Sequence, residues 1–175
     1  MKIYNKKRKP KFLPDYLSNE INDIDFMYLK SKGIENCFFD LDHTIVHQGS
    51  LEVTDDIVQI LKKSKMNIYI ATNRVSVEKL VPISKQINAK GIMHAQKGLI
   101  AKPRKIYFQK AVEMTGTTLD KTVMVGDRLL QDTWGANRTG LATVLVGKLG
   151  PVKGVDKFIS LPEKIISHIF NKLYK

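Results

Sequence analysis

The feature that most constrains the fold is a repeated alternation between short apolar segments and longer segments with helical periodicity. The apolar segments have the length and residue types of buried strands, and they cover residues 37–40, 67–71, 91–95, 122–126 and 141–147. Between them, residues 54–65, 76–88, 104–116 and 129–140 show the patterns and stop signals of helices. Strands that alternate with helices form a parallel sheet with helices on both faces. The sequence therefore predicts an α/β, three-layer, Rossmann-like fold around a central parallel five-stranded sheet.

The two ends of the chain differ from this alternating region. Residues 1–15 form a basic N-terminal arm, in which Lys and Arg are frequent and the first acid is Asp15. The segment 18–33 predicts a short helix that ends at Gly33. Residues 151–175 predict an amphipathic C-terminal helix packed on or near the domain. We therefore expect one folded domain over residues 16–150, flanked by the arm and this helix.

Charge and composition limit the classes of partner. The net charge is +12. The arm is expected to be solvated, although such a run can also contact an anionic membrane or nucleic acid. No apolar run approaches the ~20 residues of a transmembrane helix, and Pro14, Asp15 and Glu20 interrupt any secretory signal. One cysteine, Cys37, excludes a disulfide framework within the chain. We expect a cytoplasmic protein, with a peripheral position on the inner face of the membrane as the second reading.

Polar side chains follow the predicted strands at one end of each strand. In an open parallel sheet, ligands bind at the carboxyl ends of the strands, so residues far apart in the sequence should meet at one edge. These residues are Asp40, Asp42 and Thr44, then Thr72 and Asn73, then Lys97 and Lys102, then Asp127 and Asp132.

This set of side chains suits phosphoryl chemistry with a hard metal ion. Several carboxylates in one place stay ionised only if cations compensate them, and oxygen ligands with open positions suit Mg²⁺. Thr72, Asn73 and a lysine can donate to phosphoryl oxygens, and a carboxylate can act as a nucleophile. Because side chains in extended chain alternate, Asp40 and Asp42 should project to one side and Leu41 to the other.

Four motifs resemble those of the haloacid dehalogenase (HAD) superfamily of phosphohydrolases. "DLDHT" at 40–44 resembles its D-x-D-x-T/V motif, "ATN" at 71–73 the second motif, Lys102 in "KP" the third, and "VGDRLLQD" at 125–132 the fourth. The segments "FLPDYL", "LKSKGI", "GDRLLQDTWGANRTG" and "TVLV" resemble more closely the YqeG-type branch, subfamily IIIA, which is related to phosphatidylglycerophosphate phosphatases. This closer resemblance covers residues 12–150.

The resemblance implies the roles of the first residues of the site. Asp40 would be the nucleophile and a Mg²⁺ ligand. Asp42 would be the general acid and base, and its backbone carbonyl would also bind the metal. Thr72 and Asn73 would hold the transferring phosphoryl group.

The remaining roles fall on residues after the third and fourth strands. Lys102 would neutralise the nucleophile and the phosphate, with Lys97 as a rival for this role. Asp127 would bind Mg²⁺, directly or through water, and Asp132 would support it.

Two positions depart from the pattern of the branch. His43 stands where Asn or Gly is commoner, in a turn that His tolerates. Arg128 stands where Gln is usual and adds positive charge near the site, and neither departure removes a catalytic group.

The site should lack a cap domain. The intervals from Asp42 to Thr72 and from Asn73 to Lys102 are used up by elements of the alternating pattern, and neither has room for an inserted domain of ~50 residues. An open site suits a phosphate carried on a lipid headgroup, a protein or a nucleic acid. With the basic arm it favours an anionic surface, which makes phosphatidylglycerophosphate one candidate.

Other functions fit parts of the sequence. A receiver-like phosphoacceptor would also use Asp, Thr and Lys, but Asp42 supplies the proton transfers that turnover needs. A basic adaptor that binds RNA or the ribosome, with a vestigial HAD site, fits the charge although no RNA-recognition motif is present. A phosphatase of nucleotides or other small phosphoesters is a further alternative.

Overall fold

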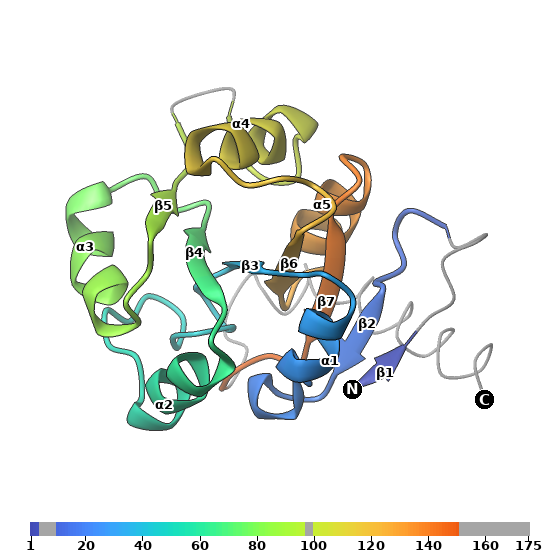
Figure 1. The fold of residues 1–175 in the computed structure, drawn as a ribbon. Helices are drawn as coiled ribbons and strands as arrows, with labels where there is room; N and C mark the ends of the chain where they lie inside the picture. The colour runs from blue at the N-terminus through green and yellow to red at the C-terminus, as the bar shows by residue number, and fades with distance from the viewer. Residues whose placement is uncertain (4–9, 97–99, 151–175) are drawn as a thin grey trace.

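One sheet organises the protein. The computed structural model describes residues 1–3, 10–96 and 100–150. Its seven-stranded sheet has the order β1-β2-β7-β6-β3-β4-β5 (Figure 1). Neighbouring strands are parallel except for the antiparallel pair β1 and β2 at one edge. The strands are β1 (Lys2–Ile3), β2 (Tyr16–Ser18), β3 (Asn36–Phe39), β4 (Asn67–Ala71), β5 (Gly91–Met93), β6 (Thr122–Gly126) and β7 (Ala142–Val146).

The predicted strands correspond to β3 to β7, and the bounds of β4 and β6 agree at both ends. The predicted central sheet of five parallel strands is confirmed, and the structure adds two strands that were not predicted, because β1 and β2 extend the sheet beyond β7. Both added strands are too short to show a period of two along the sequence. The position of β2 is set by long-range pairing, which aligns Tyr16 with Val144.

Helices cover both faces of the sheet. Figure 1 shows α4 and α5 on one side, and α1 and α2 on the other. Phe38 and Phe39 show how β3 supplies both layers, because neighbouring side chains of a strand point to opposite faces. Phe39 belongs to the core cluster that contains Leu61 of α2, whereas Phe38 packs in the cluster of Phe108 on α4. The helices are α1 (Phe26–Ser31), α2 (Asp55–Ser64), α3 (Val77–Gln86), α4 (Lys105–Thr115) and α5 (Gly135–Asn137).

Two predicted helices are divided in the structure. The segment 18–33 forms a 3₁₀ turn, η2 (Ile21–Asp23), and then α1, which begins after the N-cap Asp25. The segment 129–140 forms a π-helical turn, η3 (Leu129–Trp134), followed by α5. Sequence periodicity did not separate these pieces, because each is shorter than two or three helical turns.

The described parts of the basic arm contribute to the sheet. The arm supplies the edge strand β1. At the other end of the arm, Asp15 is buried and accepts a hydrogen bond from the Thr143 N–H at 3.0 Å. Asn137 donates to the carbonyl oxygens of Lys11 and Leu13 at 2.8 and 2.6 Å. These contacts fix residues 11–15 against β7 and α5.

The segments between the motifs build the sheet and its covering layers. After the loop 42–54, the chain forms α2, β4, α3 and β5 before Lys102. Residues 42–96 and 100–102 therefore contain no separate cap domain. Lys97 and the predicted C-terminal helix lie outside the described residues. None of the helices in the described ranges has the length and apolar character that crossing a membrane would require.

Candidate active site

The predicted site residues follow strands that end at the same level. Phe39 of β3 is paired with Ile70 of β4 and with Val125 of β6. The residues that follow these strands therefore meet at the carboxyl ends of the strands, as the rule for parallel sheets predicts. Asp40 is held there by its N–H, which donates to the Val125 carbonyl at 2.9 Å.

Lys102 lies at the centre of the acidic cluster. Its Nζ donates to Asp40 Oδ1 and to Asp132 Oδ1, both at 2.6 Å, and its side chain is 1% exposed. Burial opposes a charged amine, but the attraction of Asp132 and Asp40 outweighs it and raises the pKa of Lys102. Lys102 thus stays a cation and neutralises one of the neighbouring carboxylates.

A π-helical turn places Asp132 against this lysine. The Asp132 N–H donates to the Arg128 carbonyl at 2.9 Å, and the next N–H, of Thr133, donates to the same oxygen. Asp132 Oδ2 in turn accepts from the Arg128 N–H at 3.1 Å. With Lys102 on its other oxygen, both oxygens of Asp132 have partners, which fits the predicted supporting role better than that of a metal ligand.

Asp127 carries the least compensated carboxylate of the cluster. Within the described part of the chain, its Oδ2 is buried without a hydrogen bond, and Lys148 Nζ lies 3.7 Å away. Its Oδ1 accepts from the Thr44 hydroxyl at 3.4 Å. Burial raises the pKa of Asp127 to about 8, and repulsion from Asp132 and Asp40 adds to the rise. A cation beside Oδ2 would favour the ionised carboxylate.

The cluster fits a hard divalent cation. Asp40, Asp127 and Asp132 each offer an oxygen, and these oxygens lie within 4.8 Å of one another. Lys102 offsets only one of the three negative charges. The buried Oδ2 of Asp127 and the second oxygen of Asp40 remain as possible metal ligands. Carboxylate oxygens are the ligands that Mg²⁺ prefers.

Asn73 positions Lys102 through the backbone. Asn73 Oδ1 accepts from the Lys102 N–H at 2.8 Å, and its Nδ2 donates to the Lys102 carbonyl at 3.0 Å. Thr72 is buried, and its carbonyl accepts from the Tyr107 hydroxyl at 3.2 Å. The contact of Thr72 and Asn73 with phosphate stays a prediction; what the structure adds is that Asn73 also holds the lysine.

Asp42 is paired with Arg74 and not with the buried cluster. Arg74 Nε donates to Asp42 Oδ2 at 2.9 Å, and Nη2 donates to Oδ1 at 2.7 Å. The Gly49 N–H also donates to Oδ1. Burial disfavours the Asp42 carboxylate, but these hydrogen bonds outweigh burial and lower its pKa. Leu41 between the two acids is fully buried, as the alternation predicts.

The turn after Asp42 explains the histidine of the first motif. His43 has φ of 62°, and it is thus in the left-handed region expected for this turn. Its N–H donates to the Val46 carbonyl at 2.9 Å. His43 is buried, and its ring Nδ1 lies 3.2 Å from the Leu149 carbonyl.

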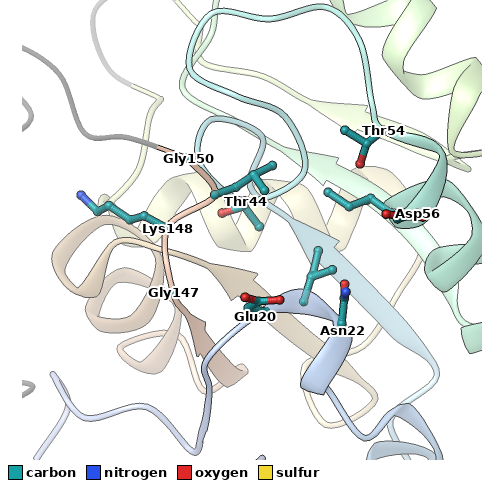
Figure 2. A pocket seen from close by; sticks show the side chains of 11 residues that line it. Glu20, Asn22, Thr44, Thr54, Asp56, Gly147, Lys148 and Gly150 are labelled. Atoms are coloured by element: carbon teal, nitrogen blue, oxygen red, sulfur yellow. The ribbon is translucent and has the colours of Figure 1, made fainter.

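A pocket of about 230 Å³ adjoins Asp127. It lies where the chain leaves β2 and β7, beside the start of α2. Thr44 and Lys148 line it and also lie against the Asp127 carboxylate. Figure 2 shows Glu20 and Asn22 on one side of it, and Asp56 on another. The pocket is therefore a polar space next to the acidic cluster.

Two residues of the site escaped the sequence analysis. Arg74 directly follows the second motif, and Lys148 comes two residues after the end of β7. Both satisfy the rule that polar residues after strand ends gather at one edge. Applied to every residue within three of a strand end, this rule would have found them.

Comparison with known proteins finds similar sequences. Residues 99–153 match the HAD-hydrolase-like family model. The chain is 28% identical over 152 residues to "Probable phosphatase YqeG" of Bacillus subtilis (strain 168), covering 85% of this chain and 83% of that protein.

Solved structures share the fold at low sequence identity. A HAD-like hydrolase, SP0104 from Streptococcus pneumoniae, is 13% identical with a TM-score of 0.52, covering 78% of this chain and 99% of that one. An uncharacterized protein from Listeria monocytogenes serotype 4b is 15% identical with a TM-score of 0.55, covering 76% and 97%. These matches show that the chain is similar to HAD-like hydrolases and to a probable phosphatase of the YqeG type, and the solved structures share its fold.

Proposed function

We propose that the chain is a Mg²⁺-dependent phosphomonoester hydrolase that acts through an aspartyl-phosphate on Asp40. The observation that carries this proposal is the buried group of Asp40, Asp127 and Asp132 around Lys102. It combines a carboxylate at a strand end, a buried cation next to it, and the Asp127 carboxylate, whose buried Oδ2 accepts no hydrogen bond within the described residues and suits a metal ion.

The residues support a two-step displacement. In the first step an Asp40 oxygen attacks phosphorus, the bond from phosphorus to the alcohol oxygen breaks, and Asp42 in its protonated form gives that oxygen a proton and becomes a carboxylate. In the second step water attacks phosphorus, Asp42 takes a proton from the water, and the phosphorus–Asp40 bond breaks. Phosphate leaves and both carboxyl groups return to their starting states.

The other residues would hold charge and geometry during both steps. Lys102 would offset the repulsion between Asp40 and the phosphoryl oxygens, and Thr72 and Asn73 would orient those oxygens. Mg²⁺ bound by Asp40, Asp127 and the Asp42 carbonyl would stabilise the charge that develops on the phosphoryl group.

We also propose phosphatidylglycerophosphate as the substrate. Support comes from the resemblance to the YqeG-type branch, from the lack of a cap within the described part of the chain, and from the net charge of +12. A positively charged protein gathers at an anionic membrane surface, which is where this lipid would be presented.

Turnover of p-nitrophenyl phosphate with Mg²⁺ tests the reaction. We expect the wild type to turn over, and Asp40→Asn to lose at least a thousandfold in kcat, because the amide is a poor nucleophile. Asp120→Asn, at an exposed acid before β6, is the matched control and should keep full activity. Equal rates for the wild type and Asp40→Asn would rule out Asp40 as the nucleophile.

The substrate requires a separate assay. Phosphate release from vesicles that contain phosphatidylglycerophosphate should exceed release from soluble glycerol 3-phosphate at equal phosphate concentration. If the protein hydrolyses soluble esters and ignores the vesicles, the lipid proposal is wrong while the reaction type stands.

A further inference from the structure

Arg74 has a fixed place at the edge of the site. Its N–H donates to the Thr72 hydroxyl oxygen at 3.2 Å. Its carbonyl accepts from the Ala95 N–H, also at 3.2 Å. These bonds hold the backbone of Arg74 where the chain leaves β4, so the side chain starts from a defined position beside the phosphoryl-binding residues.

The guanidinium of Arg74 retains hydrogen-bonding capacity. Besides its two bonds to Asp42, it donates from Nη1 to the Ser50 carbonyl at 3.0 Å. A guanidinium has five N–H donors, so these bonds leave two of them. The side chain is 18% exposed, and that of its partner Asp42 is 28% exposed. Both side chains are therefore partly open to solvent.

Arg74 and Lys102 lie on different sides of the reaction. Lys102 binds Asp40 and is buried, which places it with the phosphoryl group. Arg74 binds Asp42, the residue that would transfer a proton to the leaving oxygen. Under the proposed function, Arg74 therefore lies on the side of the alcohol and not of the phosphoryl group.

We propose that Arg74 recognises a second anionic group, a carboxylate or a phosphate, on the alcohol part of the substrate. This inference rests on the proposed phosphatase function and narrows its substrate class. The guanidinium already holds a carboxylate in two-point geometry, and carboxylates and phosphates share that geometry. An anion a few bonds from the leaving oxygen would bind the two remaining donors of Arg74 while the phosphoryl group lies at Lys102.

A matched pair of substrates tests this role. Glycerol 3-phosphate and 3-phosphoglycerate differ by a carboxylate near the leaving oxygen. We expect the wild type to prefer 3-phosphoglycerate by about tenfold or more in kcat/KM, mainly through KM, as for a charge-assisted hydrogen bond. Arg74→Gln should abolish the preference, and Arg74→Lys should keep part of it, because lysine retains the charge and loses the fork.

The control removes a positive charge elsewhere. Lys62 is exposed near the C-terminal end of α2, shortly before β4 begins, whereas Asp40 follows the carboxyl end of the parallel strand β3. Lys62→Ala should therefore keep the wild-type preference. If Arg74 only positions Asp42, Arg74→Gln will slow both substrates by the same factor and leave their ratio unchanged. That result, or a wild type without preference, overturns the inference.

Binding separates this inference from the proposed function. In an Asp40→Asn background, calorimetric titration gives the Kd of each ester without turnover, and Arg74→Gln should weaken binding of 3-phosphoglycerate alone. Absence of turnover in the wild type would contradict the phosphatase, yet the ratio of the two Kd values would still decide whether Arg74 binds the carboxylate.

Discussion

At the scale of single residues, Lys102 links chemistry to stability. It is a buried cation between Asp40 and Asp132, and removing it leaves two buried carboxylates without their partner. We predict that Lys102→Met lowers the free energy of unfolding by about 3 kcal/mol or more, since breaking a buried ion pair leaves uncompensated charge. Urea unfolding at pH 7.5 measures this loss.

A second substitution tests the cause of that loss. Adding Asp132→Asn to Lys102→Met removes one of the stranded charges, so part of the lost stability should return. If the double variant is as unstable as the sum of the single variants, the two residues are not coupled, and the loss comes from packing.

Asp127 makes stability depend on pH. Its pKa is about 8 in the folded protein, and that of Asp132 is about 6, against about 3.9 for aspartate in an unfolded chain. The folded state therefore binds more protons than the unfolded state between about pH 4 and pH 8. In EDTA the contribution of these two carboxyl groups to stability is complete below this window and falls as pH rises through it. We predict a lower melting temperature at pH 8 than at pH 6.

Binding of Mg²⁺ and substitution of Asp127 should each weaken this dependence of stability on pH. Mg²⁺ favours ionised carboxylates, so it should raise the melting temperature more at pH 8 than at pH 6. Asp127→Asn has no proton to lose, and it should flatten the change between pH 6 and pH 8 and weaken the response to Mg²⁺. Equal melting temperatures at the two pH values in EDTA would contradict the assigned pKa of Asp127.

At the scale of elements, the end of β6 leaves no room for a side chain. A Cβ on Gly126 would overlap the Asp132 carboxyl group, because η3 folds back directly onto the strand end. We predict that Gly126→Ala destabilises the protein by about 2 kcal/mol or more and lowers turnover as Asp132 moves. Gly91→Ala in β5 is the control, since its Cβ would lie 3.3 Å from Tyr69 Cδ1. A similar loss in both variants would show a general cost of alanine in these strands.

The elements that the sequence predicted are those with a complete pattern. Thr122–Gly126 is a continuous apolar run, and both its ends were predicted correctly. β2 has only three residues, and β1 has two, so each depends on pairing partners far along the chain. The π-helical turn η3 was predicted as an ordinary helix. Its hydrogen bonds join residues five apart and not four apart, and six residues are too few for this difference to show in the spacing of apolar residues.

At the scale of the whole molecule, topology converts spaced motifs into one cluster. The sequence predicted Asp40, Lys102, Asp127 and Asp132 together, and these residues meet as expected because parallel strands end at one edge. The same rule places Arg74 near Asp42, but it could not predict that the two side chains form an ion pair. Whether Arg74 turns toward Asp42 or toward solvent depends on the loop that carries Ser50, and no motif describes that loop.

The net charge of +12 leads to a prediction for the molecule as a whole. Basic residues near an anionic surface contribute about 1 kcal/mol each, and salt screens them. We predict that binding to phosphatidylglycerol vesicles weakens at least tenfold between 0.05 and 0.5 M NaCl. Binding to neutral phosphatidylcholine vesicles should be weak at both salt concentrations. Sedimentation with the vesicles measures both.

The basic arm can be tested without deleting it. Deletion would remove Lys2–Ile3 from the sheet and Lys11 from its bonds with Asn137, so glutamine at positions 6–9 is the better change. It should weaken binding to anionic vesicles and leave turnover of p-nitrophenyl phosphate unchanged.

The matched control places glutamine at four exposed lysines of α2 and α3, namely Lys62, Lys63, Lys79 and Lys85. If both variants lose binding equally, net charge alone attracts the protein to the membrane. If neither variant loses binding, the arm is a solvated segment, and its positive charge does not contribute to membrane binding.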